Sequence, residues 1–512
     1  MAYHEVTYLF LFLPLVLIAY QIVPQKRRWC VLLLAGYAFF WSFSKSLVLV
    51  LMATSMFTHY IGLWLERVKE DGDKKKQKWI LFFGVFVLLA VLGYLKYANF
   101  FVENVNGLLT AVGKSGMALE TKKIAVPIGI SFYTLQAIGY MADVYWGKIP
   151  AERHLGKVAL FLGFFPQIME GPIAMYSQTA DALWSGESLK SENLAQGSIR
   201  ILWGLFKKMI IADRLYYLVT EVFDHYENYS GAIVIVAAVS YAVQLYMEFS
   251  GCMDIVIGSG NLFGVDLPEN FRQPFFAGNA SEFWRRWHIT LGAWLKAYVF
   301  YPVSVSGLVK KWNHFARKHV GKYLTKMGIF AMTLFPVWMC NGLWHGAQWN
   351  YILYGMYYFV ILLAGEAVAP VREMVLERFH LDCHALYWRV PQILKTWMII
   401  FTGEMFFRAE GAAAGFHMFR SIFQGFELQK LWDGTLLGMG LNAADFAAVG
   451  FGILIVAVAD ILKERKLLNW DKLQEMKLPV RWILYYGLIF AVLLLGAYGT
   501  GYQQVDLIYA GF

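Results

Sequence analysis

Two histidines lie inside apolar stretches of this chain, and an imidazole in such surroundings is a candidate for chemistry. His288 closes the string Phe-Trp-Arg-Arg-Trp-His, and His345 lies in the string Gly-Leu-Trp-His-Gly. A titratable side chain is costly in an apolar medium, so it usually marks a reaction centre or a pathway. The neutral ring favoured there is the form that a general base needs to take a proton from an attacking hydroxyl. Asn341 can orient the ring of His345 or donate to an oxyanion, and Trp344 completes the candidate site.

The surroundings of these histidines indicate an all-α, polytopic membrane protein. Of the 512 residues, 58% are hydrophobic, with 19 Trp, 30 Tyr and 40 Phe. A helix needs about 20 apolar residues to cross the hydrocarbon, and the apolar stretches predict roughly nine to twelve crossings. Several stretches are too short, or too interrupted by Gly and Pro, to cross cleanly. Irregular backbone at membrane depth is tolerated only around a protein-lined or watery cavity, which predicts re-entrant segments and an interior site.

Charge and cysteine content narrow the possibilities further. The net charge of +9 sits mostly in loops, so it indicates orientation in a membrane and not binding to nucleic acid. By the positive-inside rule, both termini are expected outside the cytoplasm, in a multi-pass protein of the bacterial cytoplasmic membrane; the topology of residues 171–214 stays open. The four cysteines are scattered and predict neither a disulfide framework nor a metal site.

Polar interruptions of the apolar stretches supply further candidates for the lining of a tunnel or substrate site. Gln167 and Glu170 lie in an apolar run broken by two prolines and a glycine, which predicts a re-entrant turn; a surface loop is the alternative. Glu248 and Asp254 flank Ser-Gly-Cys, where we expect a hydrophobic helix to end. Arg285 and Trp287 precede His288, although aromatic and basic residues also collect at membrane interfaces as simple anchors.

These strings, in this order, closely resemble the membrane-bound O-acyltransferase family, and within it the branch of alginate O-acetylation and teichoic acid D-alanylation proteins. The resemblance covers most of the chain and is carried by five strings: Phe165-Pro166-Gln167 to Gly171-Pro172-Ile173, Phe249-Ser250-Gly251 to Ile257-Gly258, Leu267-Pro268-Glu269-Asn270-Phe271, Phe283 to His288, and Leu343-Trp344-His345-Gly346-Ala347 with Trp349. It implies a ring of tilted helices around a central tunnel, with His345 as the catalytic residue and His288 as support for the tunnel site. The chain departs from the family at Lys296-Ala297, usually Arg-Asp, and has Glu248 for Asp and Cys252 for Tyr.

The resemblance also implies a donor and a reaction. The expected donor is a cytoplasmic thioester, either acetyl-CoA or an acyl carrier protein, with no bound cofactor. The basic stretch Lys310–Lys326 can hold the phosphates of acetyl-CoA or the acidic face of a carrier protein. Plain positive-inside charge explains the same stretch. Acetyl, D-alanyl and other acyl groups all remain open, as does the acceptor polymer.

The end of the chain supplies one more candidate. We expect residues 1–500 to form the catalytic membrane domain and residues 501–512 an extracytoplasmic tail ending Leu-Ile-Tyr-Ala-Gly-Phe. The tail resembles the Phe-x-Tyr-x-x-Phe motif of the accessory peptide in teichoic acid D-alanylation, in which the tyrosine is thought to relay the acyl group. This implies that Tyr509 passes the group to an SGNH-type extracytoplasmic partner and on to a polysaccharide. The alternative is an aromatic tail anchored at the interface.

Two other functions fit parts of the sequence. The Trp-rich segments and two histidines are compatible with a haem-handling membrane protein, because histidine ligates haem iron axially. The acids and histidines together are compatible with a proton-coupled transporter. A haem absorption band would support the first function, and proton-driven uptake into vesicles the second. The ordered family strings favour acyl transfer.

Overall fold

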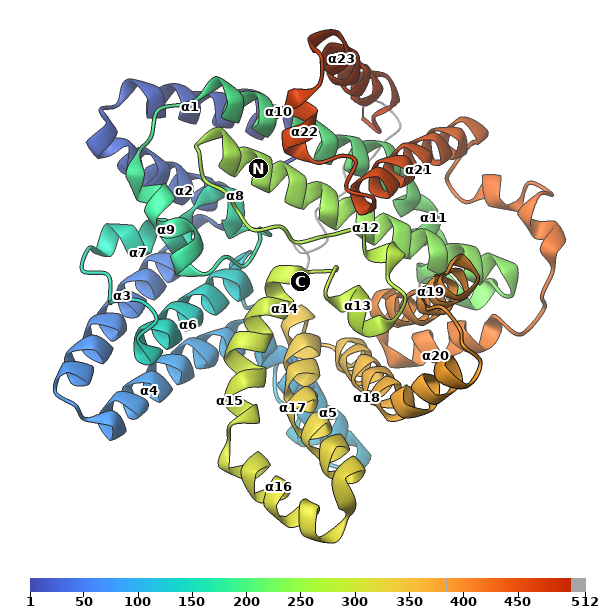
Figure 1. The fold of residues 1–512 in the computed structure, drawn as a ribbon, viewed down its shortest axis with the longest axis horizontal. Helices are drawn as coiled ribbons and strands as arrows, with labels where there is room; N and C mark the ends of the chain where they lie inside the picture. The colour runs from blue at the N-terminus through green and yellow to red at the C-terminus, as the bar shows by residue number, and fades with distance from the viewer. Residues whose placement is uncertain (384, 499–512) are drawn as a thin grey trace. The chain divides into compact units, whose positions relative to one another are not determined.

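Helices make up the regular secondary structure of the part that the computed structural model describes, residues 1–383 and 385–498, apart from one isolated β-bridge (Figure 1). In this part seven helical segments are long and apolar enough to cross a membrane. They are Gln25–Glu70, Lys74–Ala111, Ala232–Leu262, Gly321–His345, Trp349–Arg378, Ala443–Glu464 and Leu478–Leu495. The all-α, polytopic prediction is confirmed, and the larger number of nine to twelve crossings stays a prediction. Tyr509 and the tail prediction lie outside the described residues.

The chain folds into two compact units, which are described separately. The first comprises Met1–Ile201 and Cys252–Pro268. Its main helices are α1 (Leu13–Ile22), α2 (Arg28–Ser44), α3 (Val48–Glu70), α4 (Lys74–Leu92), α5 (Ala98–Ala111), α6 (Ile130–Trp146), α7 (Leu155–Gly163), α8 (Phe165–Ile168), α9 (Tyr176–Ser185) and the first part of α10 (Ser191–Phe206). Helix α3 packs against α4, α6 and α7.

The second unit comprises Leu202–Gly251 and the described residues from Glu269 onwards. After the π-helical turn η6 (Lys207–Ala212) it contains α11 (Asp213–Asp224), most of α12 (Ala232–Leu262), α13 (Ala280–Trp284), α14 (Ile289–Leu295), η9 (Lys296–Phe300), α15 (Tyr301–Ser304), α16 (Gly307–His319), α17 (Gly321–His345), α18 (Trp349–Arg378), α19 (Leu386–Arg408), α20 (Gly411–Ser421), α21 (Ala443–Glu464), α22 (Trp470–Glu475) and α23 (Leu478–Leu495). Helices α16, α17 and α18 follow one another as packed neighbours.

The expected end of a helix near Glu248 is wrong. Helix α12 runs without interruption from Ala232 to Leu262, through the Ser-Gly-Cys string. A Cβ built on Gly251 would lie 2.8 Å from the carbonyl oxygen of Gly204, so the glycine is needed for close helix packing. Small residues at a helix interface allow backbones to approach each other, and here that role prevails over their tendency to weaken a helix.

The segment around Gln167 is irregular, as predicted, but it is not a surface loop. Helix α7 ends at Gly163, α8 is a single turn, and a turn and irregular backbone follow as far as Met175. Phe164, Gln167 and Glu170 are each at most 1% exposed. Burial of this backbone excludes the surface-loop alternative, while insertion into a membrane as a re-entrant turn stays a prediction.

Candidate active site

His345 is the last residue of α17 and lies at the tip of a helical hairpin. The stretch from Phe335 to Trp349 is not one continuous helix, because the structure interrupts it at Gly346 and begins α18 at Trp349. A Cβ on Gly346 would lie 2.3 Å from the ring of Tyr351. The glycine therefore lets the chain turn tightly against α18, which places His345 between the two helices.

The same hairpin is closed by a second glycine. A Cβ on Gly342 would lie 2.5 Å from the carbonyl oxygen of Tyr351, so α17 and α18 touch through their backbones. The space beside Gly342 is thus filled by the second helix of the hairpin. Because interiors are close-packed, this contact fixes the position of His345 relative to α18.

An aromatic cage surrounds the imidazole of His345, which is only 5% exposed. The ring centroid lies 4.9 Å from that of Trp344, 5.0 Å from Phe407 and 5.9 Å from Tyr354, each in an edge-to-face arrangement. Rings in this geometry exclude water and hold the imidazole at a defined angle. Burial among apolar rings disfavours a charged imidazole, and the role of His345 as a general base stays a prediction.

Asn341 lies one helical turn before His345 and is buried. Residues four apart share a helix face, so the amide and the imidazole lie on the same side of α17. The Oδ1 atom of Asn341 has no hydrogen-bond partner among residues 1–383 and 385–498. A buried polar atom in this position is costly unless it meets a partner, which suits a group that contacts substrate.

His288 is positioned by a pairing between two of the sequence strings. Phe271 and Trp287 form an isolated antiparallel bridge. Next to this bridge, the backbone N–H of Ile289 donates to the carbonyl oxygen of Asn270 at 3.0 Å. His288 itself caps α14 with a left-handed backbone, φ +47°. A non-glycine residue in that region is held there by its surroundings and often belongs to a functional site.

Asn270 also determines which nitrogen of His288 carries the proton. Its Oδ1 accepts from the backbone N–H and the hydroxyl of Thr290, at 3.1 and 2.9 Å. A backbone N–H only donates, so the atom facing it is the amide oxygen. The same oxygen lies 3.2 Å from His288 Nδ1, which must therefore be the donor. Burial lowers the pKa of His288 to about 3, so the ring is neutral and its lone pair lies on Nε2.

Trp344 joins the two histidines. Its ring centroid lies 5.3 Å from that of His288 and 4.9 Å from that of His345, both edge-to-face. The sequence predicted His288, His345 and Trp344 as members of one site, and the structure brings all three together in the second unit. They form a buried centre with two imidazoles and aromatic walls.

A buried acid beside this centre was missed by the sequence analysis. Glu404 on α19 is 1% exposed and accepts a hydrogen bond from the Tyr354 hydroxyl at 3.1 Å. The ring of Tyr354 is one wall of the His345 cage. The signal was available, since Glu404 is the only charged residue in the apolar stretch Thr396–Phe407.

Two of the predicted acids are members of buried ion pairs. Lys208 lies 3.2 Å from Glu248 and 2.9 Å from Asp213, and both Lys208 and Glu248 are fully buried. In the first unit, Arg200 lies 3.0 Å from Asp254. Charges are found inside proteins mainly when they are paired, so these contacts account for the burial of both acids. A role for either acid in lining a tunnel stays a prediction.

The remaining predicted residues are placed as follows. In the first unit, Gln167 donates to the carbonyl oxygen of Phe161 at 2.7 Å, and the Cys252 thiol lies 3.6 Å from Glu170. In the second unit, Trp287 packs on Phe271 and Phe283 beside the bridge. Arg285 is exposed. Arg286, which was not predicted, has the larger structural role, because it joins Glu282 and Glu464, each at 2.7 Å.

Comparison with known proteins gives a matching family model and several relatives. Residues 150–407 match the model of the membrane-bound O-acyltransferase family. The chain is 32% identical to "Probable alginate O-acetylase AlgI" of Pseudomonas aeruginosa over 459 residues, 89% of this chain and 80% of the relative.

Two further relatives carry other names. The chain is 30% identical to the peptidoglycan O-acetyltransferase of Helicobacter pylori over 79% of its own length and 76% of the relative. It is 28% identical to the teichoic acid D-alanyltransferase of Bacillus subtilis over 46% of its length and 58% of the relative.

Proposed function

Because this chain belongs to the membrane-bound O-acyltransferase family, we propose that it transfers an acetyl group from a cytoplasmic thioester to the hydroxyl groups of an exported polysaccharide or cell-wall polymer. The observation that carries the proposal is the buried pair His288 and His345, whose rings both contact Trp344. Two neutral imidazoles in a dry, aromatic site can move protons without the cost of a buried charge.

In the proposed reaction His345 is the general base. It takes the proton of the attacking hydroxyl, whose oxygen forms the new bond to the thioester carbonyl carbon. The carbon–sulfur bond then breaks, and the thiolate leaves with the proton held by the imidazole. In this proposal the Nδ2–H group of Asn341, on the same face of α17 as His345, donates to the developing oxyanion, and such a donor stabilises negative charge in a site without water. His288, with its lone pair on Nε2, accepts a hydrogen bond and supports the site.

An acetyl group is favoured over D-alanine by the extent of similarity. The relatives named for O-acetylation match 89% and 79% of this chain, whereas two teichoic acid D-alanyltransferases match 46% and 60%. A thioester donor, acetyl-CoA or an acetylated carrier, supplies the activated carbonyl. The protein itself contributes binding, orientation and proton transfer.

The rest of the proposal concerns the route to the acceptor. Residues 1–500 are proposed as the catalytic membrane domain, with the helices arranged as a ring around a tunnel in the bacterial cytoplasmic membrane. Tyr509, in the tail 501–512, is proposed as a relay that receives the acetyl group as a phenyl ester and passes it to the serine of an SGNH-type partner outside. A phenol is a suitable carrier because its ester is more activated than an alkyl ester.

The test uses the purified full chain and acetyl-CoA labelled in the acetyl group, followed by mapping of the label on the protein. We expect label on Tyr509, and His345→Ala should slow its appearance by about 10²–10⁴-fold, the range for loss of a general base. His417→Ala, which removes an exposed histidine, is the matched control and should leave the rate unchanged. Wild-type turnover in His345→Ala would refute the catalytic assignment, and undiminished polysaccharide acetylation in Tyr509→Phe would refute the relay alone.

A further inference from the structure

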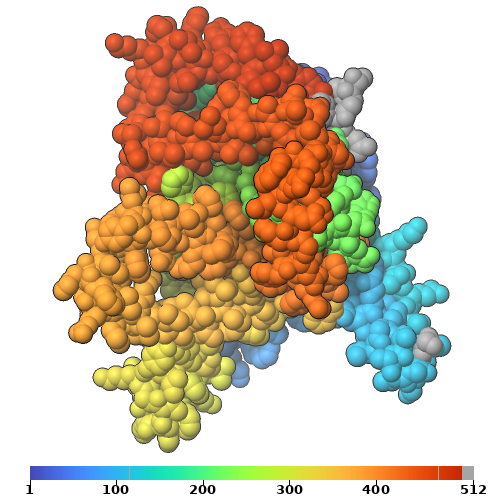
Figure 2. Space-filling model, turned by 90° about the vertical axis from the view of Figure 1, so that its right-hand side faces the viewer, coloured from blue at the N-terminus to red at the C-terminus, as the bar shows by residue number. Residues whose placement is uncertain are grey.

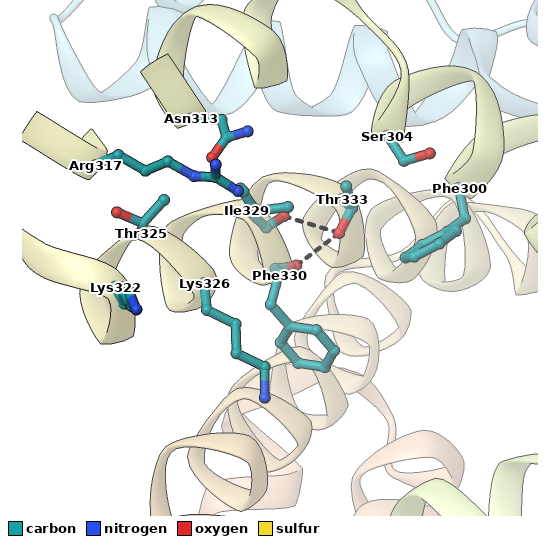
Figure 3. Close-up of a pocket in the computed structure, with 10 residues that line it drawn as sticks. All are labelled: Phe300, Ser304, Asn313, Arg317, Lys322, Thr325, Lys326, Ile329, Phe330 and Thr333. Carbon is teal, nitrogen blue, oxygen red and sulfur yellow. Dashed lines mark hydrogen bonds between the residues drawn. The ribbon is translucent and has the colours of Figure 1, made fainter. Parts of the chain in front are cut away.

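A second site of interest lies on the α16–α17 hairpin, away from the histidines. A cavity of about 640 Å³ opens between η9, α15, α16 and the first half of α17 (Figure 3). Its volume is in the range of small-molecule sites. Asn313, Arg317 and Lys322 lie toward one end of the cavity, Phe300 lies toward the other, and the ring of Phe330 lies between them beside the Lys326 side chain. The cavity is therefore amphiphilic.

Its polar end carries positive charge that lacks a carboxylate partner. In the described part of the chain, neither Arg317 nor Lys322 has a carboxylate oxygen within 4.0 Å. Lys326, the third cation, is 2.6 Å from Glu366. The described residues that line the cavity include no acid. Like charges held together repel each other, and this arrangement favours binding of an anion.

The start of α17 adds to this field. Within the described residues, its first turn contains no acidic side chain, and its N-cap residue Val320 makes no side-chain capping bond. The N-terminus of a 25-residue helix carries about half a positive charge and several N–H groups without intrahelical acceptors. Lys322 and Thr325, which line the cavity, lie in the first turns of this helix. A phosphate group bound here would face both the side chains and the dipole.

The hairpin is rigid enough to keep the cavity open. A Cβ on Gly328 would lie 2.3–2.5 Å from the indole of Trp312, so α16 and α17 are in close contact there. The indole N–H of Trp312 also reaches the carbonyl oxygen of Thr325 at 3.4 Å. The site is thus preformed, and binding does not have to order the two helices.

Helix α16 has the character of a membrane-surface helix. Leu308 and Phe315 are exposed apolar side chains, while Lys310, Lys311 and Lys318 are exposed cations. Figure 2 shows the yellow end of the hairpin projecting beyond the orange helices that follow it along the chain. Helices of this composition lie at the level of the lipid headgroups.

The distance to His345 separates this cavity from the transfer site. From Lys322 to His345, α17 rises about 35 Å at 1.5 Å per residue. A pantetheine arm has about as many backbone bonds as four residues and reaches about 15 Å when fully extended. Phosphates of coenzyme A held at Lys322 therefore leave the thioester far from His345.

We propose that this cavity binds an anionic phospholipid, with the headgroup phosphate between Arg317, Lys322 and the N-terminus of α17 and an acyl chain along Phe300 and Phe330. Basic pockets between helices at the cytoplasmic face are suited to phosphate headgroups. The lipid holds the basic end of the hairpin at the membrane surface. This site is independent of the proposed acyl transfer.

The test measures lipid binding to the detergent-purified full chain by native mass spectrometry, with phosphatidylglycerol as the anionic lipid and phosphatidylcholine as the neutral one. The double variant Arg317→Gln/Lys322→Gln should bind phosphatidylglycerol roughly 25-fold more weakly, about fivefold for each cation removed. Lys310→Gln/Lys318→Gln removes the same charge from exposed positions of α16 outside the cavity lining, and should keep wild-type affinity. Neither variant should change the weak binding of phosphatidylcholine.

Three outcomes overturn the proposal. Equal weakening in both double variants means diffuse attraction to a charged surface. Unchanged binding in Arg317→Gln/Lys322→Gln means that the cavity is not the site. Displacement of bound phosphatidylglycerol by coenzyme A, lost in the same variant, assigns the cavity to the donor. Should the double variant lose thermal stability in detergent alone, the exposed single change Lys322→Gln, with an expected fivefold effect, decides the matter.

Discussion

The hydrogen bond between Asn270 and His288 offers a direct test of how the site is prepared for chemistry, through Asn270→Ala. The side chain of Asn270 is fully buried, and its Oδ1 accepts from His288 Nδ1 and from the N–H and hydroxyl of Thr290. Alanine removes all three acceptor contacts. The Nδ1–H group of His288 and the backbone N–H of Thr290 then stay buried without this acceptor, at a cost of about 1–3 kcal/mol each. We expect the free energy of unfolding to fall by about 2–6 kcal/mol.

The same change should remove the preference of the His288 ring for the tautomer with its proton on Nδ1. A hydrogen bond of net strength about 1.4 kcal/mol corresponds to a tenfold preference for the Nδ1–H form. Without it, a larger fraction of the protein has the proton on Nε2, the nitrogen that should accept. With the two tautomers otherwise equal, the Nδ1–H fraction falls from about ten elevenths to about one half, so we expect acetyl transfer to slow about twofold. Because this role is positional, the loss should appear in kcat more than in KM.

Asn270→Asp is the matched control, since a carboxylate oxygen keeps an acceptor opposite Nδ1. The negative charge favours protonated His288 and so raises its pKa from about 3. Activity should be close to wild type at high pH and fall as the pH drops through the raised value. Two measurements decide the matter: acetyl transfer across pH, and ¹⁵N NMR of histidine-labelled protein, which distinguishes N–H from lone-pair nitrogens. Unchanged ¹⁵N signals and unchanged kcat in Asn270→Ala would refute the reasoning.

Three further predictions address other contacts. Gly342→Val should lower the thermal midpoint and the transfer rate, because its Cβ would lie 2.5 Å from the carbonyl oxygen of Tyr351 and overpacking costs about 1–3 kcal/mol. Differential scanning calorimetry measures the thermal midpoint. Glu404→Leu should reduce kcat more than Glu404→Gln, because only the amide still accepts from the Tyr354 hydroxyl beside His345; labelled acetyl transfer measures the difference, and equal rates would contradict it. Burial raises the pKa of Glu152, but hydrogen bonds and a nearby lysine outweigh burial and lower it. A carboxyl whose pKa is lower in the folded protein stabilises the fold at a pH above its pKa in the unfolded chain, and this stability is lost as the pH falls through the folded pKa. Glu152→Gln should therefore flatten the decline of the thermal midpoint between about pH 5 and 3.

The sequence predicted the parts of the site that depend on composition. A long apolar chain must form helices in a membrane, and a histidine inside it stands out by its cost, so His288, His345 and the all-α class followed directly. The contact of both rings with Trp344 was not predictable. It depends on a bridge between Phe271 and Trp287, and nothing in either string alone specifies the other as its partner.

Errors arose where one residue type has two physical roles. Ser250, Gly251 and Cys252 suggested a helix end, because small and flexible residues weaken a helix. In the structure they allow close packing of a continuous helix, and the carbonyl of Gly204 occupies the space that a Cβ would need. Only the presence of a neighbouring helix decides between the two roles, and that information is tertiary. For Glu404 the sequence shows a lone charge in an apolar stretch, but its contact with Tyr354 on another helix is known only from the structure.

The placement of charges explains why the histidines, and not the ion-paired acids Glu248 and Asp254, are the candidates for chemistry. Lys208 contacts both Glu248 and Asp213, and Arg200 contacts Asp254. Breaking such a pair leaves a buried charge uncompensated, at a cost of about 3–5 kcal/mol, so these acids are poorly suited to changing protonation during turnover. An imidazole in an aromatic cage has the opposite property, because its resting state is neutral and its proton can come and go within one catalytic step. We therefore expect substitutions in the ion pairs to affect stability first and rate only as a consequence, whereas His345→Ala should affect the rate in a protein that still folds.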